Sequence, residues 1–129
     1  MSKKKKVFVA TVGGGRETPK IIGRKKIGGR VFKIATMKKK AKYAFIGGNI
    51  ISFRLLGVPS NIPYDEIVYW KGQSKESAKH TITHEIDEEH LERYGFMNYH
   101  PAHDYSLKYE TTNYTPHEVL RMCGGRCKK

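Results

Sequence analysis

The first half of the chain contains short stretches in which apolar and polar residues alternate, separated by glycines. In residues 30–36, the larger side chains Phe32 and Ile34 fall on the same face. A period of two residues is typical of β-strands. We expect Gly47-Gly48 to form a tight turn between two of them. The predicted strands are residues 6–12, 20–26, 30–36, 42–46, 49–56 and 66–70, which would form a twisted, mostly antiparallel sheet.

The pattern of the second half has the period of an α-helix. We expect a helix that begins at a capping serine, Ser74 or Ser77, and runs to about residue 94, where Gly95 ends it. One side of this helix carries Ala78, Ile82 and Ile86, and roughly the opposite side carries His80, His84, Glu88 and Leu91. The helix can therefore pack against the sheet with one side and face a functional site with the other.

Two shorter helices are expected after it. One spans about residues 100–110, with Pro101 tolerated in its first turn. The other begins at Thr115-Pro116-His117-Glu118, which has the capping-box pattern with proline at the first helical position, and runs to about residue 123. The pattern predicts one α+β domain over residues 1–129. It comprises a basic disordered tail at 1–6, a mainly β part at 7–70 with a loop at 57–64, and a mainly α part at 71–129.

The histidines are concentrated in the predicted long helix and the segment after it, because five of the six lie within residues 80–104. His84 and Glu88 are four residues apart, so on a helix they point from one face and can hold one cation. Glu85 lies about 100° around the helix, where it can take a proton from a water at an open coordination position. We expect His103 to be the third ligand, with His80 as the alternative.

This arrangement resembles zincin-like metallopeptidases, whose active-site helix carries H-E-x-x-H. It is closer to small phage and archaeal proteins with an H-E-x-x-E variant, followed by L-x-x-x-G-x-x-x-Y-x-x-A-H. The matching residues here are Leu91, Gly95, Tyr99, Ala102 and His103. The resemblance covers about residues 65–110. It implies that His84, Glu88 and His103 bind the metal, that Glu85 is the general base, and that strand 66–70 is an edge strand beside the cleft for an extended peptide.

The chain departs from the zincin pattern at Glu88, where those enzymes have a second histidine. A carboxylate still binds Zn²⁺, the metal that we expect first, but its harder oxygen also suits Mn²⁺ or Fe²⁺. The departure also fits a relative that has kept the fold and lost catalysis. A different interpretation is an ordinary helix whose acidic residues face water and balance nearby lysines; these residues are Glu85, Asp87, Glu88, Glu89 and Glu92.

The whole excess of positive charge lies in the first half. Residues 1–70 contain 16 Lys and Arg and 3 acidic residues, whereas residues 71–129 contain 9 of each. Such a distribution favours nucleic acid or another polyanion as a partner. It equally fits lysines that keep exposed strands soluble, or the lysine-rich surface of a protein from a thermophilic source. The candidate nucleic-acid-binding residues are Arg24, Lys25, Lys26, Lys38, Lys39 and Lys40.

Cysteines and apolar runs limit the remaining possibilities. The only two cysteines, Cys123 and Cys127, exclude a disulfide-rich secreted scaffold. With His117 they could form a small structural zinc site, or they could form a disulfide or remain free thiols. No apolar run reaches the ~20 residues of a membrane span, so a cytoplasmic protein without a membrane partner is expected. The sequence thus predicts a metal-dependent hydrolase acting on peptides or proteins, or alternatively a basic nucleic-acid-binding protein with an inert metal site.

Overall fold

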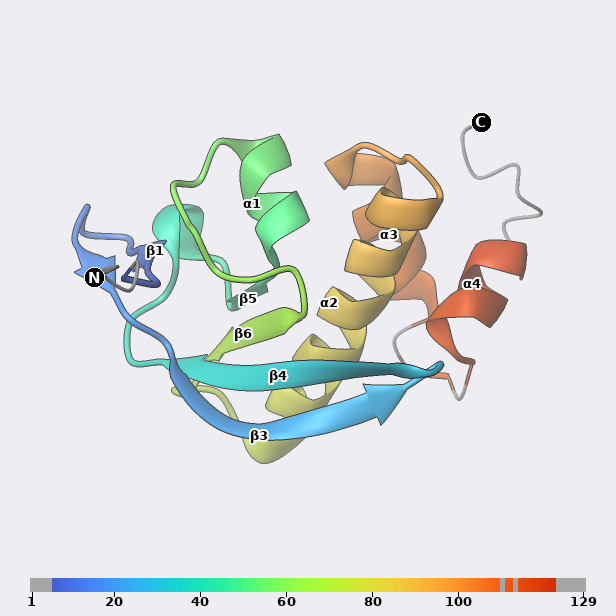
Figure 1. Ribbon diagram of the computed structural model, residues 1–129, viewed down its shortest axis with the longest axis horizontal. Coiled ribbons are helices and arrows are strands. Elements are labelled where there is room, and N and C mark those ends of the chain that lie inside the picture. Colours follow the sequence, from blue (N-terminus) through green and yellow to red (C-terminus); the bar gives the residue numbers. More distant parts are fainter. Residues whose placement is uncertain (1–5, 110, 113, 123–129) are drawn as a thin grey trace, which may run out of the picture.

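The computed structural model describes residues 6–109, 111–112 and 114–122 and has an α+β fold (Figure 1). A four-stranded sheet contains, in spatial order, β3 (Lys20–Ile27), β4 (Arg30–Met37), β6 (Glu66–Trp70) and β5 (Gly47–Gly48). Two short strands, β1 (Val9–Ala10) and β2 (Arg16–Glu17), pair separately. The predicted α+β class is therefore confirmed.

The sheet is mixed rather than wholly antiparallel. Strands β3 and β4 form an antiparallel hairpin, whereas β4 and β6 run parallel. A parallel pair needs a crossover connection, and the residues between β4 and β6 provide one that contains a helix. Strand β6 lies inside the sheet because β5 pairs antiparallel with its other side. The expectation that residues 66–70 form the edge strand beside a cleft is therefore wrong, since β5 occupies that edge.

The segment between β4 and β6 differs most from the sequence-based prediction. Residues 42–46 do not form a strand, because Lys42–Ala44 is a 3₁₀ turn (η1) in which Tyr43 and Ala44 have positive φ. Gly47-Gly48 is a strand instead of a turn. Residues 49–56 are not a strand, because α1 (Ile50–Leu56) begins there. Of residues 6–12, only β1 is a strand.

Helix α1 has clear start and stop residues. The side chain of Asn49 accepts a hydrogen bond from the Ser52 N–H at its N-terminus, and Gly57 ends it with a left-handed φ of 73°. Gly48 allows the helix to lie close to β5, because a Cβ there would be 1.9 Å from the ring of Phe53. The buried ring of Phe53 therefore requires a glycine at this position.

The three later helices follow the prediction closely. Helix α2 (Lys75–Tyr94) is capped by Ser74 and ends at Gly95, whose N–H bonds to the Leu91 carbonyl. Helix α3 spans Tyr99–Tyr109 and α4 spans Pro116–Met122. The capping box of α4 is formed in both directions, since Thr115 Oγ1 accepts from the Glu118 N–H and Glu118 accepts from the Thr115 N–H.

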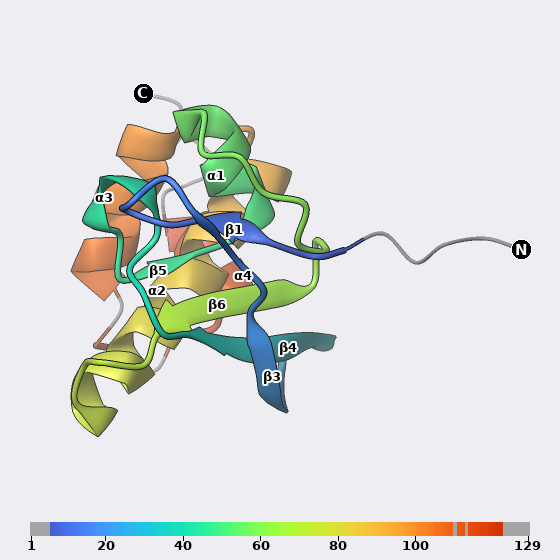
Figure 2. The same cartoon turned by 90° about the vertical axis from the view of Figure 1, so that its left-hand side faces the viewer.

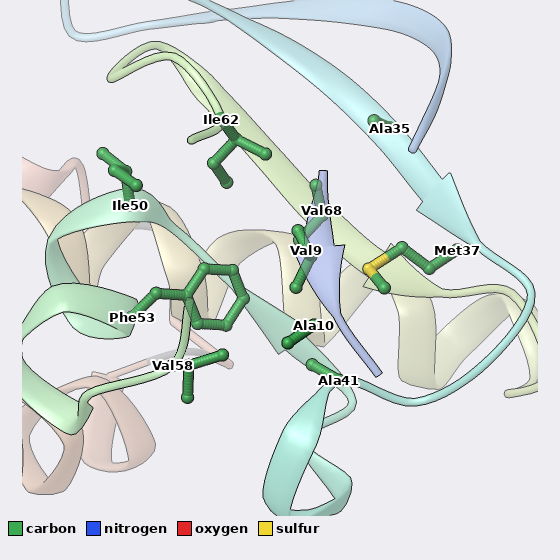
Figure 3. Close-up of a cluster of buried hydrophobic side chains, with 10 residues drawn as sticks. All are labelled: Val9, Ala10, Ala35, Met37, Ala41, Ile50, Phe53, Val58, Ile62 and Val68. Atoms are coloured by element: carbon green, nitrogen blue, oxygen red, sulfur yellow. The ribbon is translucent and has the colours of Figure 1, made fainter. Parts of the chain in front are cut away.

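Helix α2 lies against one face of the sheet, and the N-terminal segment covers part of the other, over Ala35, Met37 and Val68 (Figures 1 and 2). Ile86 of α2 packs on Phe32, Ile34 and Ile67. On the opposite side, Phe53 packs with residues of the N-terminal segment and sheet, as Figure 3 shows for Val9, Met37 and Val68. A third cluster joins α2, α3 and α4. Among the described residues, none of the helices combines the length and apolar character needed to cross a bilayer.

Candidate metal centre

Three side chains from α2 and α3 converge on one point. His84 Nε2 lies 3.0 Å from Glu88 Oε2 and 3.1 Å from His103 Nδ1, and the last two atoms are 3.0 Å apart. Among the described residues, these three form the group of potential metal ligands whose ligand atoms are close enough to share one ion. The spacing of His84 and Glu88 on one helical face and the position of His103 on the next helix are as predicted.

The spacing of these three atoms is compatible with one bound metal ion. Two ligands bound at 2.0–2.1 Å to a tetrahedral Zn²⁺ lie about 3.3–3.4 Å apart, so the observed atoms need to separate by only ~0.3 Å. Two imidazoles and one carboxylate leave a coordination position open for water or substrate, which is the pattern of catalytic rather than structural zinc sites. The three residues could therefore hold one divalent cation.

A buried polar network fixes Glu88. Ser52 Oγ of α1 lies 2.6 Å from Glu88 Oε1 and 2.8 Å from both carboxyl oxygens of Glu92. Burial and the neighbouring Glu88 charge raise the pKa of Glu92 to about 9. Glu92 is then protonated at neutral pH and can donate to Ser52, which in turn donates to Glu88 Oε1. This leaves Glu88 Oε2 directed at the two histidines.

The surroundings of Glu88 and Glu85 shift their pKa values in opposite directions. Burial alone would raise the pKa of Glu88, but hydrogen bonds with His103 and His84 outweigh it and lower that pKa. This shift favours the ionised form of Glu88, the form that binds a cation. Burial and the Glu88 charge raise the pKa of Glu85 well above its ordinary value. Such a shift is typical of carboxyl groups that transfer protons in active sites.

Glu85 is held next to the three candidate ligands. Asn49 Nδ2 donates a hydrogen bond to Glu85 Oε1 at 2.9 Å. The backbone of β5 also lies beside it, because a Cβ on Gly47 would be 3.2 Å from Glu85 Cγ. Asn49, at the start of α1, and Gly47, in β5, thus both lie against Glu85 of α2, which the sequence analysis proposes as the general base.

The candidate ligands line a cavity of about 330 Å³. Its polar wall contains His84, Glu85, Glu88 and His103. Its apolar wall comes from α1, α3 and the residues before β5, and consists of Phe45, Ile46, Phe53, Leu56 and Leu107. A cavity with mainly apolar walls and a few convergent polar groups is the usual form of a small-molecule or substrate site.

Tyr99 lies beside the candidate metal ligands, in contact with His103. Its ring stacks on the His103 ring with centroids 5.1 Å apart, and its hydroxyl lies 3.2 Å from His103 Nδ1. Burial and the nearby Glu88 charge raise the pKa of Tyr99, so the hydroxyl keeps its proton. Tyr99 is one of the residues that match the spaced pattern after the H-E-x-x-E motif, but that pattern did not predict its contact with His103.

The interpretation of α2 as a solvated acidic helix is wrong. Five of its six acidic residues, Glu85, Asp87, Glu88, Glu89 and Glu92, are each at most 6% exposed. Burying so many carboxyl groups requires partners, and Asn49, Ser52, Arg30 and the two histidines provide several of them. These acidic side chains lie inside the protein and do not balance surface lysines.

The alternative site residues lie elsewhere. His80 lines the same cavity but does not belong to the group of three ligand atoms. His117 lies on α4, where its ring faces that of His90 at 6.2 Å between centroids. Cys123 and Cys127 lie outside the described residues.

The two basic clusters have different environments. Arg24 and Lys26 are exposed on β3, and Lys25 is half-buried. The second cluster is in the turn after β4, where the backbone N–H groups of Lys38 and Lys39 donate to the Glu17 carboxylate. Lys40 there lies 4.7 Å from the ring of Trp70. In the turn at 38–40, two backbone N–H groups and the side chain of Lys40 thus have partners within the protein.

Models of known protein families, curated proteins and solved structures were compared with this chain, and none matches it.

Proposed function

We propose that this protein is a metal-dependent hydrolase that cleaves peptide bonds, with His84, Glu88 and His103 as metal ligands and Glu85 as the general base. The observation that carries the proposal is the convergence of the three ligand atoms within 3.0–3.1 Å of one another beside a cavity. A structural site would use a fourth protein ligand. Zn²⁺ is the metal that this ligand set favours, and Mn²⁺ and Fe²⁺ are compatible with it.

A divalent cation at this position would lower the pKa of a water and polarise a substrate carbonyl. The charge of the cation would also lower the pKa of Glu85, so its ionised form would take the proton from the attacking water and return it to the amine that leaves. Asn49 orients the Glu85 carboxyl for this transfer, since it donates to Oε1. Tyr99, with its proton retained, would donate a hydrogen bond to the oxyanion that develops on the carbonyl oxygen.

The surroundings of the cavity support a peptide as substrate. Strand β5 ends the sheet beside Glu85, so its backbone is placed where an extended peptide could add as a further strand. The apolar wall that includes Leu56 and Leu107 is suited to a bulky apolar side chain next to the scissile bond. Both features fit a peptide better than a small polar substrate.

The test is cleavage of quenched-fluorescence peptides that carry Leu, Phe, Asp or Lys at the central position. Zn²⁺-loaded protein should cleave the Leu and Phe peptides preferentially. A chelator should abolish cleavage, and added Zn²⁺ should restore it. Mg²⁺ serves as the control, because it prefers oxygen ligands and should not restore activity. Protein that holds Zn²⁺ and cleaves none of the peptides would refute hydrolysis and leave a metal-binding role.

A further inference from the structure

One face of the β3–β4 hairpin is exposed and basic. In the register of the two strands, Arg24 pairs with Lys33 and Lys26 pairs with Val31, so these side chains lie on the same face. This face is the one opposite α2, because Phe32 and Ile34 point to the helix. We define the hairpin face as Ile21, Arg24, Lys26, Val31 and Lys33.

Acidic residues are absent from this part of the sequence. Residues 18–64 contain 11 Lys and Arg and no Asp or Glu. The acidic residues of α2 do not compensate, since Glu85, Glu88 and Glu89 are buried on the far side of the sheet. Basic residues therefore dominate the hairpin, whose acidic neighbours are Asp65, paired with Arg30, and Glu66, beside Lys33.

The basic side chains of the hairpin face have few internal partners. The charge of Lys33 acts on the carboxyl group of Glu66 and lowers its pKa. Burial raises the same pKa by more, so the net shift is upward. In the part of the chain that the structure describes, no ion pair is found for Arg24 or Lys26. Like charges directly opposite on paired strands, as at Arg24 and Lys33, are destabilising. An anion bound between them would relieve this repulsion.

We propose that the hairpin face binds the phosphate backbone of duplex DNA, with Arg24 and Lys26 as its principal contacts. A two-stranded β-ribbon fits the major groove, and eight residues of strand extend over about 26 Å. The Gly28-Gly29 turn, with φ of 56° and 83°, leaves a narrow tip. Strand β3 is at the opposite edge of the sheet from β5 (Figure 2), so bound DNA would leave the cavity beside β5 accessible.

The composition of the hairpin face distinguishes duplex DNA from other polyanions. The face carries no aromatic side chain, whereas sites for single-stranded nucleic acid stack bases on aromatic rings. Its apolar residues, Ile21 and Val31, are about half exposed (48% and 49%) but isolated. A membrane surface would need a broader apolar face with large side chains.

The experiment measures binding of the full chain to a fluorescent 20-base-pair duplex between 50 and 300 mM salt. In the Arg24→Gln/Lys26→Gln variant, the negative slope of log K against log salt should become less steep by about two units, because two phosphate contacts are lost. At 0.1 M salt this corresponds to a loss of affinity of about 60-fold. The control is Lys75→Gln/Lys79→Gln, two exposed lysines of α2, which gives the same change in net charge. It should reduce affinity less than ~3-fold.

Four results would overturn the proposal. The first is no binding to the duplex at 50 mM salt. The second is an equal loss of affinity in the two variants, because it would indicate a diffuse charge effect without a site. The third is tighter binding of single-stranded DNA or of vesicles with acidic lipids than of the duplex. Thermal unfolding of both variants shows whether the hairpin is intact, and a folded hairpin variant that still binds normally also contradicts the proposal.

Discussion

Replacing Glu85 by glutamine is expected to lower kcat/KM for peptide cleavage by about 10²- to 10⁴-fold, while the metal stays bound. The amide is nearly the same size as the carboxyl group and can still accept the hydrogen bond from Asn49, so the fold and the three ligands are preserved. It cannot accept a proton from water. The assay combines peptide cleavage with elemental analysis of the purified variant.

Glu76→Gln is the matched control for this experiment, because Glu76 is exposed in the first turn of the same helix. It should leave both cleavage and metal content unchanged. If Glu85→Gln retains more than a tenth of the activity, Glu85 is not the general base. If the variant loses its metal, Glu85 helps to hold the ion and its catalytic role is not supported.

Replacing Arg30 by methionine is expected to lower the free energy of unfolding by about 3–5 kcal/mol. The Arg30 guanidinium binds both carboxyl oxygens of Glu89, at 2.8 and 3.0 Å, and the Glu89 side chain is fully buried. Arg93, 3.5 Å away, is more exposed and cannot replace this paired contact. The substitution would leave a buried charge largely unpaired. Urea denaturation measures the effect.

The double variant Arg30→Met/Glu89→Met separates the cost of an unpaired charge from the loss of packing. It should recover most of the lost stability, because replacing both partners of a buried pair by apolar residues is often close to neutral. Arg24→Met, an exposed position on the same hairpin, is the control and should change stability by less than about 0.5 kcal/mol. A loss below 1 kcal/mol for Arg30→Met would show that Glu89 does not depend on this ion pair.

The candidate metal group could be predicted from the sequence because it depends on short-range spacing. His84 and Glu88 are one turn apart on a helix whose cap, Ser74, and terminus, Gly95, are marked by residue type. His103 follows on the next helix after a short connection. The contacts among the three side chains are then set largely by helical geometry.

The network that supports the metal group could not be predicted because it comes from α1. The apolar run I-I-S-F-R-L-L resembles a strand in composition, although Asn49 and Ser52 stand at the spacing of an N-terminal cap. Reading that spacing would have identified the helix and the hydroxyl near α2. The close approach of Gly48 to Phe53 depends on tertiary packing, which a local pattern does not reveal.

The buried acidic residues of α2 were ambiguous for the same reason. An acidic run on a helix usually faces water, so sequence alone permitted a solvated helix as well as a site. The deciding partners are distant along the chain: Arg30 is 59 residues from Glu89, and Ser52 is 36 residues from Glu88. Only the folded arrangement of the hairpin and α1 around α2 shows that these carboxyl groups are inside.

The most direct test of the metal centre is the Zn²⁺ content after equilibrium dialysis at low micromolar free Zn²⁺, measured by elemental analysis. The proposed ligand set predicts about one equivalent in the unmodified protein and in His80→Ala, and less than about a tenth of an equivalent in His84→Ala and His103→Ala. No bound Zn²⁺ in the unmodified protein, or one full equivalent in both His84→Ala and His103→Ala, would contradict it.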